Sequence, residues 1–511
     1  MITKIFIKNF KGFGEPIQEI PLNKITLIFG ANSAGKTSII QPLLLLKQTL
    51  EEASDPQTVL LPNGYMISLG NYREFVFKHE TDREIFIGFE VDHKDYLGYQ
   101  FNLKKNILSI SGFNGRISSK KVRRLTRGRI KREYNFSGKR LKKGSYTITL
   151  DDIENVLAQE IDRTLQNLLE VGSFEEILSK KKYRNLRTYF IREMEKSDEK
   201  DPTVFINKMN DRFQDLKRHV QDYDILKHFT KEVVALENPL LLKIKDTRRF
   251  YDLRIKSDLD NGENFLVDFI REEIRFPYLY RLLTSVHDIF ARTLQSLIFI
   301  GPLREEPIRI YTYSGNIPST VGIEGEFTAE MLYYSQTIRD SINNKFKELD
   351  IKYQINVTPI SEHENDIFRI KLTDQIIKTD VTITDVGFGL SQILPIIVQS
   401  YALEQGTIFI EQPEIHIHPK LQTELAQLFY ERITENQNIQ FIIETHSEHI
   451  ILRLQRLIRK GLLNPSDISI LYVTRENKGI ACKQLKLNNK GNFIDHWPEG
   501  FFEEAFIERF G

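Results

Sequence analysis

The chain has few of the residues that build cross-linked or metal-rich domains. Of its 511 residues only one, Cys482, is cysteine, one is tryptophan and five are methionine. A single cysteine excludes a disulfide framework within the chain and a multi-cysteine zinc or iron–sulfur site. We expect Cys482 to be a buried or idle thiol rather than a catalytic one, which fits a reducing compartment.

Long apolar runs are also missing. The leucines of 43–46 are closely followed by Lys47, and the apolar stretch 390–403 is interrupted by polar residues and a proline. Neither reaches the roughly 20 apolar residues of a membrane helix. The first ten residues alternate polar and apolar side chains like a strand and lack the apolar core of a secretory signal. We therefore expect a cytoplasmic protein with no membrane segment.

Basic residues gather in one segment, although the formal net charge of the whole chain is only +1. Residues 104–143 contain fifteen Lys or Arg and one acidic residue, Glu133. Such a run is either a solvated surface or a surface that binds phosphate, because an anion relieves its self-repulsion. The second alternative predicts DNA or RNA contacts from Lys120, Lys121, Arg123, Arg124, Arg127, Arg129, Lys131 and Arg132.

Hydrophobic periodicity indicates an α/β protein. Strands are predicted for 2–10 and 24–29, a buried helix for 37–50, and antiparallel strands for 85–98 and 99–110. Residues 151–296 look helical and strongly charged, without a sustained heptad pattern. Strands return at 297–301, 353–358, 367–372 and 381–383.

A phosphate-binding loop is predicted at Gly30-Ala-Asn-Ser-Ala-Gly-Lys-Thr37, between a strand and a helix. Backbone N–H groups of such a loop and of the helix start surround phosphates, because small residues let the backbone come close. Lys36 is expected to reach the β- and γ-phosphates, and Thr37 to ligate Mg²⁺. The predicted ATP-binding residues are Gly30, Ala31, Asn32, Ser33, Ala34, Gly35, Lys36, Thr37 and Ser38.

The second half of this site is predicted far along the chain. A buried strand ends at Glu411, as is typical of the acid that holds Mg²⁺, and we assign that role to Glu411. Upstream, the glycine-rich segment 385–392 begins an apolar helix that can present N–H donors to a phosphate. Downstream, the buried strand 441–444 leads to His446.

This order of phosphate loop, glycine-rich segment, acid-terminated strand and histidine-terminated strand resembles the ATP-binding-cassette class of P-loop ATPases. The long separation of the two halves is similar to the SMC-like and RecF-like ATPases, in which an insertion splits one ATPase head. Five segments look like the bacterial AAA-type ATPases related to the OLD family: Asn9–Phe13, Leu69–Phe75, Gly301–Arg304, Glu411–Pro419 and Glu444–His449. A sixth segment, Trp497–Glu504, resembles a C-terminal domain of unknown role that some of these ATPases carry.

The resemblance implies an α/β, ABC-type P-loop ATPase head, a mixed sheet flanked by helices, that binds ATP and Mg²⁺. It also implies a homodimer in which Gly387, Gly389 and Ser391 act in trans, with a higher oligomer left open, while His446 contacts the γ-phosphate. The expected parts are the head segment 1–103, the basic insertion 104–150, the helical insertion 151–296, the head segment 297–460 and a tail domain 461–511.

One position departs from this class. The residue after the Mg²⁺-side acid is usually a glutamate that polarises the attacking water, and here it is Gln412, which cannot accept a proton. Either Glu414 or another group takes this role, or hydrolysis is slow and the protein is an ATP-held clamp. Arg304 and Arg309 are expected either to reach phosphate or to pair with neighbouring glutamates.

Three functions remain open. Relatives of this class, including the ATPases of Septu-type systems, serve in antiphage defence, which implies an ATP-gated nucleic-acid sensor controlling a separate effector. Only 65 residues follow His446, too few for the nuclease domain of OLD-type proteins, so we expect the effector to be another polypeptide, a nuclease. The alternatives are a RecF-like ATPase of DNA repair or chromosome maintenance, and an ATP-gated scaffold that binds no nucleic acid. The histidines at 416, 418, 446 and 449 lack a zinc-binding pattern.

Overall fold

The computed structural model describes most of the chain outside the insertion. The described residues are 1–55, 58–104, 107–118, 145–149, 288–349, 351–360 and 366–496, with a few positions between 201 and 214. The predicted nucleic-acid contacts at 120–132, nearly all of the expected helical insertion, and the tail from Trp497 lie outside them.

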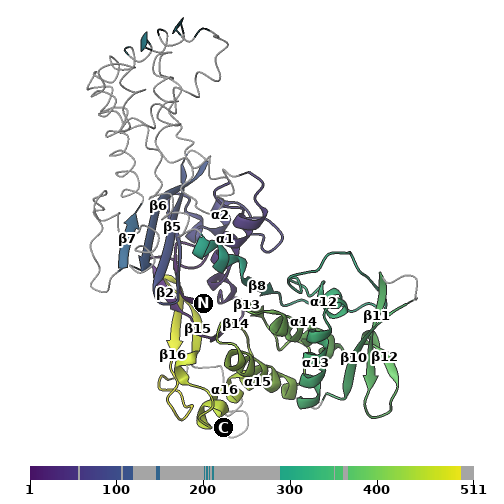
Figure 1. Cartoon of the computed structure of the whole chain (residues 1–511). Coiled ribbons are helices and arrows are strands. Elements are labelled where there is room, and N and C mark those ends of the chain that lie inside the picture. The colour runs from purple at the N-terminus through teal and green to yellow at the C-terminus, as the bar shows by residue number, and fades with distance from the viewer. Residues whose placement is uncertain are drawn as a thin grey trace.

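A six-stranded, mainly parallel sheet forms the centre of the protein (Figure 1). In spatial order its strands are β16 (Gly479–Leu485), β15 (Ile468–Glu476), β3 (Ile25–Gly30), β14 (Ile439–Glu444), β13 (Gly406–Glu411) and β8 (Leu297–Ile300). Only β16 runs antiparallel to its neighbour. The strands β15 and β16, from the segment predicted as a tail, therefore extend the sheet that carries the phosphate loop.

Helices cover this sheet and bury its central strands. Every residue of β3 and β14 is buried, as expected for parallel strands with both faces covered. Helices that contribute buried residues to the core include α1 (Gln41–Glu52), α14 (Phe388–Ala402), α15 (Pro419–Glu435) and α16 (Glu448–Arg459). None of the helices in the described part of the chain is both long and apolar enough to cross a membrane.

The parallel register brings the carboxyl ends of four strands to one edge. Glu411 lies opposite Glu444, and Glu444 lies opposite Ile28, two residues before the phosphate loop. Ile410 lies opposite Ile300, after which the segment Gly301–Arg304 begins. Ligands of open α/β sheets bind outside the carboxyl ends of the strands, so this edge is where a site is expected.

An antiparallel sheet packs beside the central one (Figure 1). Its strands, in spatial order, are β2 (Gln18–Pro21), β1 (Ile2–Lys8), β4 (Ile85–Val91), β5 (Asp95–Lys104), β6 (Ile107–Ser118) and β7 (Ser145–Thr149). The predicted break between strands at 98 and 99 is wrong. The chain turns at 92–94 instead, where Asp92 and His93 adopt φ angles of 53° and 55°. Ser118 pairs with Ser145, so most of the basic segment connects two paired strands.

A third, smaller sheet forms a lobe on the other side of the central sheet (Figure 1). It contains β9 (Tyr311–Thr312), β10 (Tyr353–Pro359), β11 (Ile367–Asp374) and β12 (Asp380–Thr382), accompanied by α12 (Thr328–Tyr334) and α13 (Gln336–Glu348). The short helical turns are η1 (Thr37–Ile39), α2 (Tyr72–Phe75), η2 (Phe77–His79), η5 (Ile383–Asp385) and η6 (Pro465–Asp467). Because β12 leads through η5 directly into α14, this lobe is joined to the glycine-rich segment.

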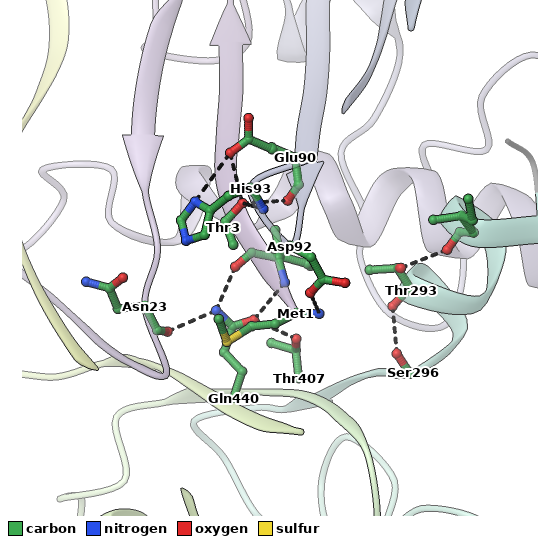
Figure 2. Close-up of polar contacts among 12 residues, drawn as sticks. Met1, Thr3, Asn23, Glu90, Asp92, His93, Thr293, Ser296, Thr407 and Gln440 are labelled. Carbon is green, nitrogen blue, oxygen red and sulfur yellow. Dashed lines mark hydrogen bonds and ion pairs between the residues drawn. The ribbon is translucent and has the colours of Figure 1, made fainter. Parts of the chain in front are cut away.

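A buried glutamine joins the antiparallel sheet to the central one (Figure 2). The Gln440 side chain on β14 is fully buried; its amide nitrogen donates to Ile2 O at 2.7 Å and to Asn23 O at 2.9 Å. Its amide oxygen accepts from Ile2 N at 3.1 Å and from Thr407 Oγ1 at 2.9 Å. All four hydrogen-bonding positions of this amide are therefore used. Gln440 lies near the first residue of β14, whereas Glu444 is its last residue.

We expect Gln440→Leu to destabilise the protein by about 3 kcal/mol or more, because it leaves several buried polar groups of both sheets without partners. The midpoint of chemical denaturation measures this loss. Gln437→Leu, at an exposed position just before β14, is the matched control and should leave the midpoint nearly unchanged. Equal midpoints for both variants would contradict the role assigned to Gln440.

Candidate functional site

The loop 30–37 has the backbone that a phosphate loop requires. Gly30 has a φ of 151°, and a Cβ there would lie 2.4 Å from Val473 O on β15, so a side chain does not fit. Ser33 and Gly35 have φ angles of 60° and 96°. These left-handed positions turn the chain sharply between β3 and η1, and strain of this kind clusters at functional sites.

The loop closes around the side chain of Lys36. Within it, the backbone N–H of Ala34 donates to Ala31 O at 3.2 Å. The buried Lys36 side chain curls over the loop, and its Nζ donates to Gly30 O at 3.2 Å and Ala31 O at 3.1 Å. A cluster of N–H donors around a cation suits a chain of phosphates.

Two carboxylates lie at the same edge. Thr37 Oγ1 donates to Glu444 Oε2 at 2.8 Å, and Glu444 Oε1 lies 4.0 Å from Lys36 Nζ. Glu444 was not among the predicted site residues, although β13 and β14 both end in glutamate. The glutamate at the end of both strands is the sequence feature that could have identified Glu444. The strand register shows why it matters, because it places Glu444 between β3 and Glu411.

A buried arginine holds the turn after Glu411. Arg304 is 5% exposed, and its Nη2 donates to Glu411 O at 2.8 Å while its Nη1 lies 3.5 Å from Gln412 O. Gln412 has a φ of 45°, and its N–H donates to Glu444 O at 2.7 Å. The strained Gln412 backbone is therefore held from both sides, which fixes its position beside the two acids.

Arg309 has a different role from Arg304. Its guanidinium pairs with Asp385 through two contacts, of 2.7 and 3.2 Å, just before the glycine-rich segment. These hydrogen bonds and those from Thr382 lower the pKa of Asp385 to about 2. Neither Arg304 nor Arg309 pairs with Glu305 or Glu306, so that predicted alternative is wrong for both arginines. Each holds a backbone segment at the edge of the site.

The electrostatics of this edge favour a cation. Burial, with the negative charge of Glu444 added, raises the pKa of Glu411 to about 8 even though Arg304 acts against it. Burial also raises the pKa of Glu444, and it lowers the pKa of Lys36 and that of Arg304, the latter to about 10. Charged forms are penalised here because little solvent screens them, so a bound divalent cation would relieve the two carboxylates.

Glu414 anchors the segment that carries His446. Its two oxygens accept from Thr445 Oγ1 at 2.7 Å and from the backbone N–H of His446 at 2.6 Å. Burial and the charge of Lys36 lower the pKa of His446, which favours the neutral imidazole. The predicted residues Lys36, Glu411, Gln412, Glu414 and His446 thus meet at one edge of the sheet.

The glycine-rich segment lies apart from this group. Gly387 precedes the first turn of α14, and Gly387 and Gly389 line an open cavity of about 490 Å³ with His416 and His418. Ser391 lines a separate cavity of about 120 Å³. A Cβ at Gly389 would lie 2.9 Å from His416 O, so the start of α14 packs directly against the segment that follows Glu414. The structure does not bring all three predicted residues to one surface.

The oxygens at this edge suit Mg²⁺, although they come from few residues. Thr37 Oγ1 and the carboxylates of Glu411 and Glu444 are the hard ligands that Mg²⁺ prefers, and Mg²⁺ usually keeps several waters and binds substrate phosphates. Among the described residues, no group of three or more His, Cys, Asp and Glu is arranged to hold a metal by itself. The donor set therefore fits a metal that arrives with phosphates.

A parallel sheet with a phosphate loop after its central strand and acids at the ends of the next two strands defines a P-loop nucleotide-binding protein. Comparison of the sequence with protein families supports this class. Residues 1–451 match the AAA ATPase domain family, and residues 463–509 match a family described as Protein of unknown function (DUF3696). The chain belongs to the AAA ATPase domain family, and the predicted fold class is confirmed.

The solved structures to which the chain is similar include SMC heads. One is the Smc head domain with an extended coiled coil bound to the C-terminal domain of ScpA, from Pyrococcus furiosus, with 12% identity, a TM-score of 0.36, and coverage of 95% of this chain and 96% of that chain. The Pyrococcus yayanosii Smc head has 11% identity, a TM-score of 0.36 and coverage of 96% and 98%.

The third structure is the SMC head domain from Thermotoga maritima, with 9% identity, a TM-score of 0.34, and coverage of 95% of this chain and 99% of that chain. These values describe distant similarities. No curated protein matches the chain.

Proposed function

We propose that this protein binds and slowly hydrolyses ATP with Mg²⁺, and that its ATP-bound form is a long-lived clamp. The observation that carries the proposal is the meeting of Lys36, Thr37 and two acid-terminated strands at one edge of the sheet, with Gln412 where a proton acceptor is expected. The loop N–H groups and Lys36 bind the phosphates, while Thr37 and Glu411 hold the metal. The metal, when bound, neutralises phosphate charge that develops during hydrolysis.

Slow hydrolysis follows from the groups around the attacking water. Gln412 orients a water but takes no proton, and both oxygens of Glu414 already accept hydrogen bonds from the segment of His446. Glu444 already accepts from Thr37 Oγ1 and lies beside Lys36. In this proposal His446 is the group that contacts the γ-phosphate. Slow hydrolysis gives the ATP-bound form a long lifetime. Such a form suits a regulatory signal better than a motor, which needs rapid turnover.

The proposed clamp is a homodimer whose glycine-rich segments complete each other's site. The support is the exposed start of α14, where Gly387 has open space and Gly389 borders the cavity of about 490 Å³. A helix start of this kind presents N–H donors to an anion. The proposal places Gly387 and Gly389 on the partner's phosphates, whereas Ser391 supports the helix from its other side.

The clamp is proposed to respond to DNA or RNA and to control a separate effector, a nuclease, in antiphage defence. The support is the charge of residues 104–143, most of which connect β6 to β7, together with the resemblance to OLD-related ATPases. A segment this rich in lysine and arginine supplies the positive charges that contacts with nucleic-acid phosphates need.

Phosphate release, measured with and without duplex DNA or RNA, tests this function. We expect slow release that nucleic acid changes severalfold. Replacing Lys121, Arg123, Arg124 and Arg127 together with glutamine should remove most nucleic-acid binding and its dependence on salt, because fewer counterions are released. Four matched replacements at exposed basic residues form the control: Arg456 and Arg459 of α16, Lys460 directly after it, and Lys483 of β16. Unchanged binding in the first variant would exclude the basic segment as the contact.

A further inference from the structure

The cavity of about 120 Å³ that Ser391 lines lies where α12 and α14 meet the lobe of the smaller sheet (Figure 1). Its walls come from the segment after Arg304, from the start of α12 between Gly325 and Ala329, and from α14 up to Pro395. The volume is well below the roughly 300 Å³ of the smallest drug-sized ligand pockets. The cavity therefore has room for one side chain rather than for a nucleotide.

Part of the lining is apolar. Ala329, Ile370, Ile383 and Leu394 line the cavity, and all four are buried. The alkyl stems of lysine and arginine pack well on a wall of this kind while their charged ends reach polar groups.

Every polar side chain in the lining can accept a hydrogen bond, and none carries a positive charge. These side chains are Glu305, Glu306, Tyr311, Glu326, Thr328 and Ser391. The two arginines nearest in sequence are engaged elsewhere, Arg304 with Glu411 O and Arg309 with Asp385. The lining is thus complementary to a cation that donates hydrogen bonds.

A buried hydroxyl lacks a partner at this cavity. Thr328 is 7% exposed, and within the described part of the chain its Oγ1 has no hydrogen-bond partner. That oxygen lies 3.3 Å from where a Cβ of Gly325 would be, and both residues line the cavity. Buried polar atoms are nearly always hydrogen-bonded, so this oxygen indicates a donor supplied from outside the chain.

The carboxylates of the lining are available to such a donor. Glu305 and Glu306 are exposed, and neither forms an ion pair with another described residue. Burial, with the charge of Glu305 added, raises the pKa of Tyr311, so this carboxylate acts on the same cavity. Glu326 is held in place, because it accepts from Tyr65 Oη and, through Oε2, from the N–H of Glu324 at 2.9 Å.

Large apolar side chains are exposed next to these lining residues. Leu303 is 73% exposed, Ile308 55% and Phe327 40%, and each lies within two residues of a glutamate of the lining. A small pocket for one anchoring side chain, with apolar contacts around it, is typical of a protein–protein interface. This setting favours a side chain of a protein over a free amine.

We infer that this cavity receives a lysine or arginine side chain of a partner protein, which carries it between apolar residues. The inference rests on the proposed function in taking this partner to be the effector. Its place suits such a partner, since α14 begins at the glycine-rich segment and Arg304 holds the turn after Glu411. Whatever factor ATP changes the affinity for the partner by, the partner changes the affinity for ATP by the same factor.

Selection of random peptides displayed on phage tests the chemistry of the cavity. The wild-type full chain is immobilised, and an excess of the chain with Glu305→Gln and Glu306→Gln in solution removes peptides that bind elsewhere. We expect the recovered peptides to share a lysine or arginine between apolar residues. A pool without this feature, or the recovery of no peptide that prefers the wild type, would overturn the inference.

Fluorescence anisotropy then measures the affinity of the tightest peptide. Replacing its basic residue with norleucine, which keeps an alkyl stem without the charge, should weaken binding to the wild type by about 10-fold or more. The same replacement should matter little for the chain with Glu305→Gln and Glu306→Gln, where the charge contact is already lost. Thr328→Val, which removes the hydroxyl alone, should weaken binding severalfold. An equal effect of norleucine on both chains would place the contact elsewhere and overturn the inference.

The chain with Glu404→Gln and Glu476→Gln, two exposed glutamates outside the cavity, is the matched control and should bind the peptide like the wild type. Equal weakening in both doubly substituted chains would reduce the effect to general charge attraction and contradict the inference. Failure of the proposed function has a different signature, because the wild type would then bind no Mg²⁺-ATP while the peptide results stayed as expected.

Discussion

Lys36→Ala is expected to lower the affinity for Mg²⁺-ATP by about 100-fold and to abolish phosphate release, since charge-assisted hydrogen bonds to phosphate are among the strongest that a protein makes. The side chain is 5% exposed and already lies over the loop, so little ordering is needed before it contacts a phosphate. Equilibrium binding of a fluorescent ATP analogue measures the affinity.

Lys94→Ala, which removes a lysine at an exposed position, is the control for the loss of one positive charge. Thermal denaturation shows whether the Lys36 variant still folds, because Glu444 loses the cation 4.0 Å from its Oε1. An affinity within about threefold of the wild type in a folded variant would remove the phosphate loop from the proposed function.

Gln412→Glu is expected to raise the rate of phosphate release by about 10- to 100-fold, because it supplies a proton acceptor beside the metal-side acid. The backbone is already prepared for this change: Gln412 is held by its own N–H and, through its carbonyl, by Arg304. The affinity for Mg²⁺-ATP should change little, since the substitution alters the group that faces the water rather than those that bind phosphate.

Gln412→Asn retains an amide and is the matched control; it should not accelerate hydrolysis. Single-turnover measurements separate the chemical step from product release. A Gln412→Glu variant that hydrolyses ATP at the wild-type rate would show that proton transfer at this position does not limit turnover. The clamp would then depend on another step, such as separation of the two heads.

Much of this site could be predicted from short-range patterns. The phosphate loop, with its glycines, Lys36 and Thr37, is one contiguous segment, and its chemistry depends on the local backbone. Glu411 is recognisable because an apolar strand ends in an acid. The strands near 2–8 and 25–30 also lie where alternation and β-branched residues predict them, whereas the turn at 92–94 was misplaced because the whole region has strand-like composition.

Groups that act through distant contacts were harder to predict. Arg304 was noted as a candidate for phosphate or for local ion pairs, but its actual partners are the carbonyl oxygens of Glu411 and Gln412, more than one hundred residues away. Glu444 ends a strand as Glu411 does, and only the pairing of β14 with β3 puts it on Thr37. Gly387, Gly389 and Ser391 were predicted to act as one set, yet Ser391 lines a different cavity from the two glycines.

The sequence alone determined the class of the protein, its phosphate loop and the amide at position 412, because each of these is a property of a few consecutive residues. The tertiary structure alone decided which strand lies between the loop and Glu411, how Arg304 holds the turn, and that a C-terminal hairpin borders the phosphate loop. The physical reason is that strand order and register depend on packing across the whole core, where residues hundreds of positions apart become neighbours.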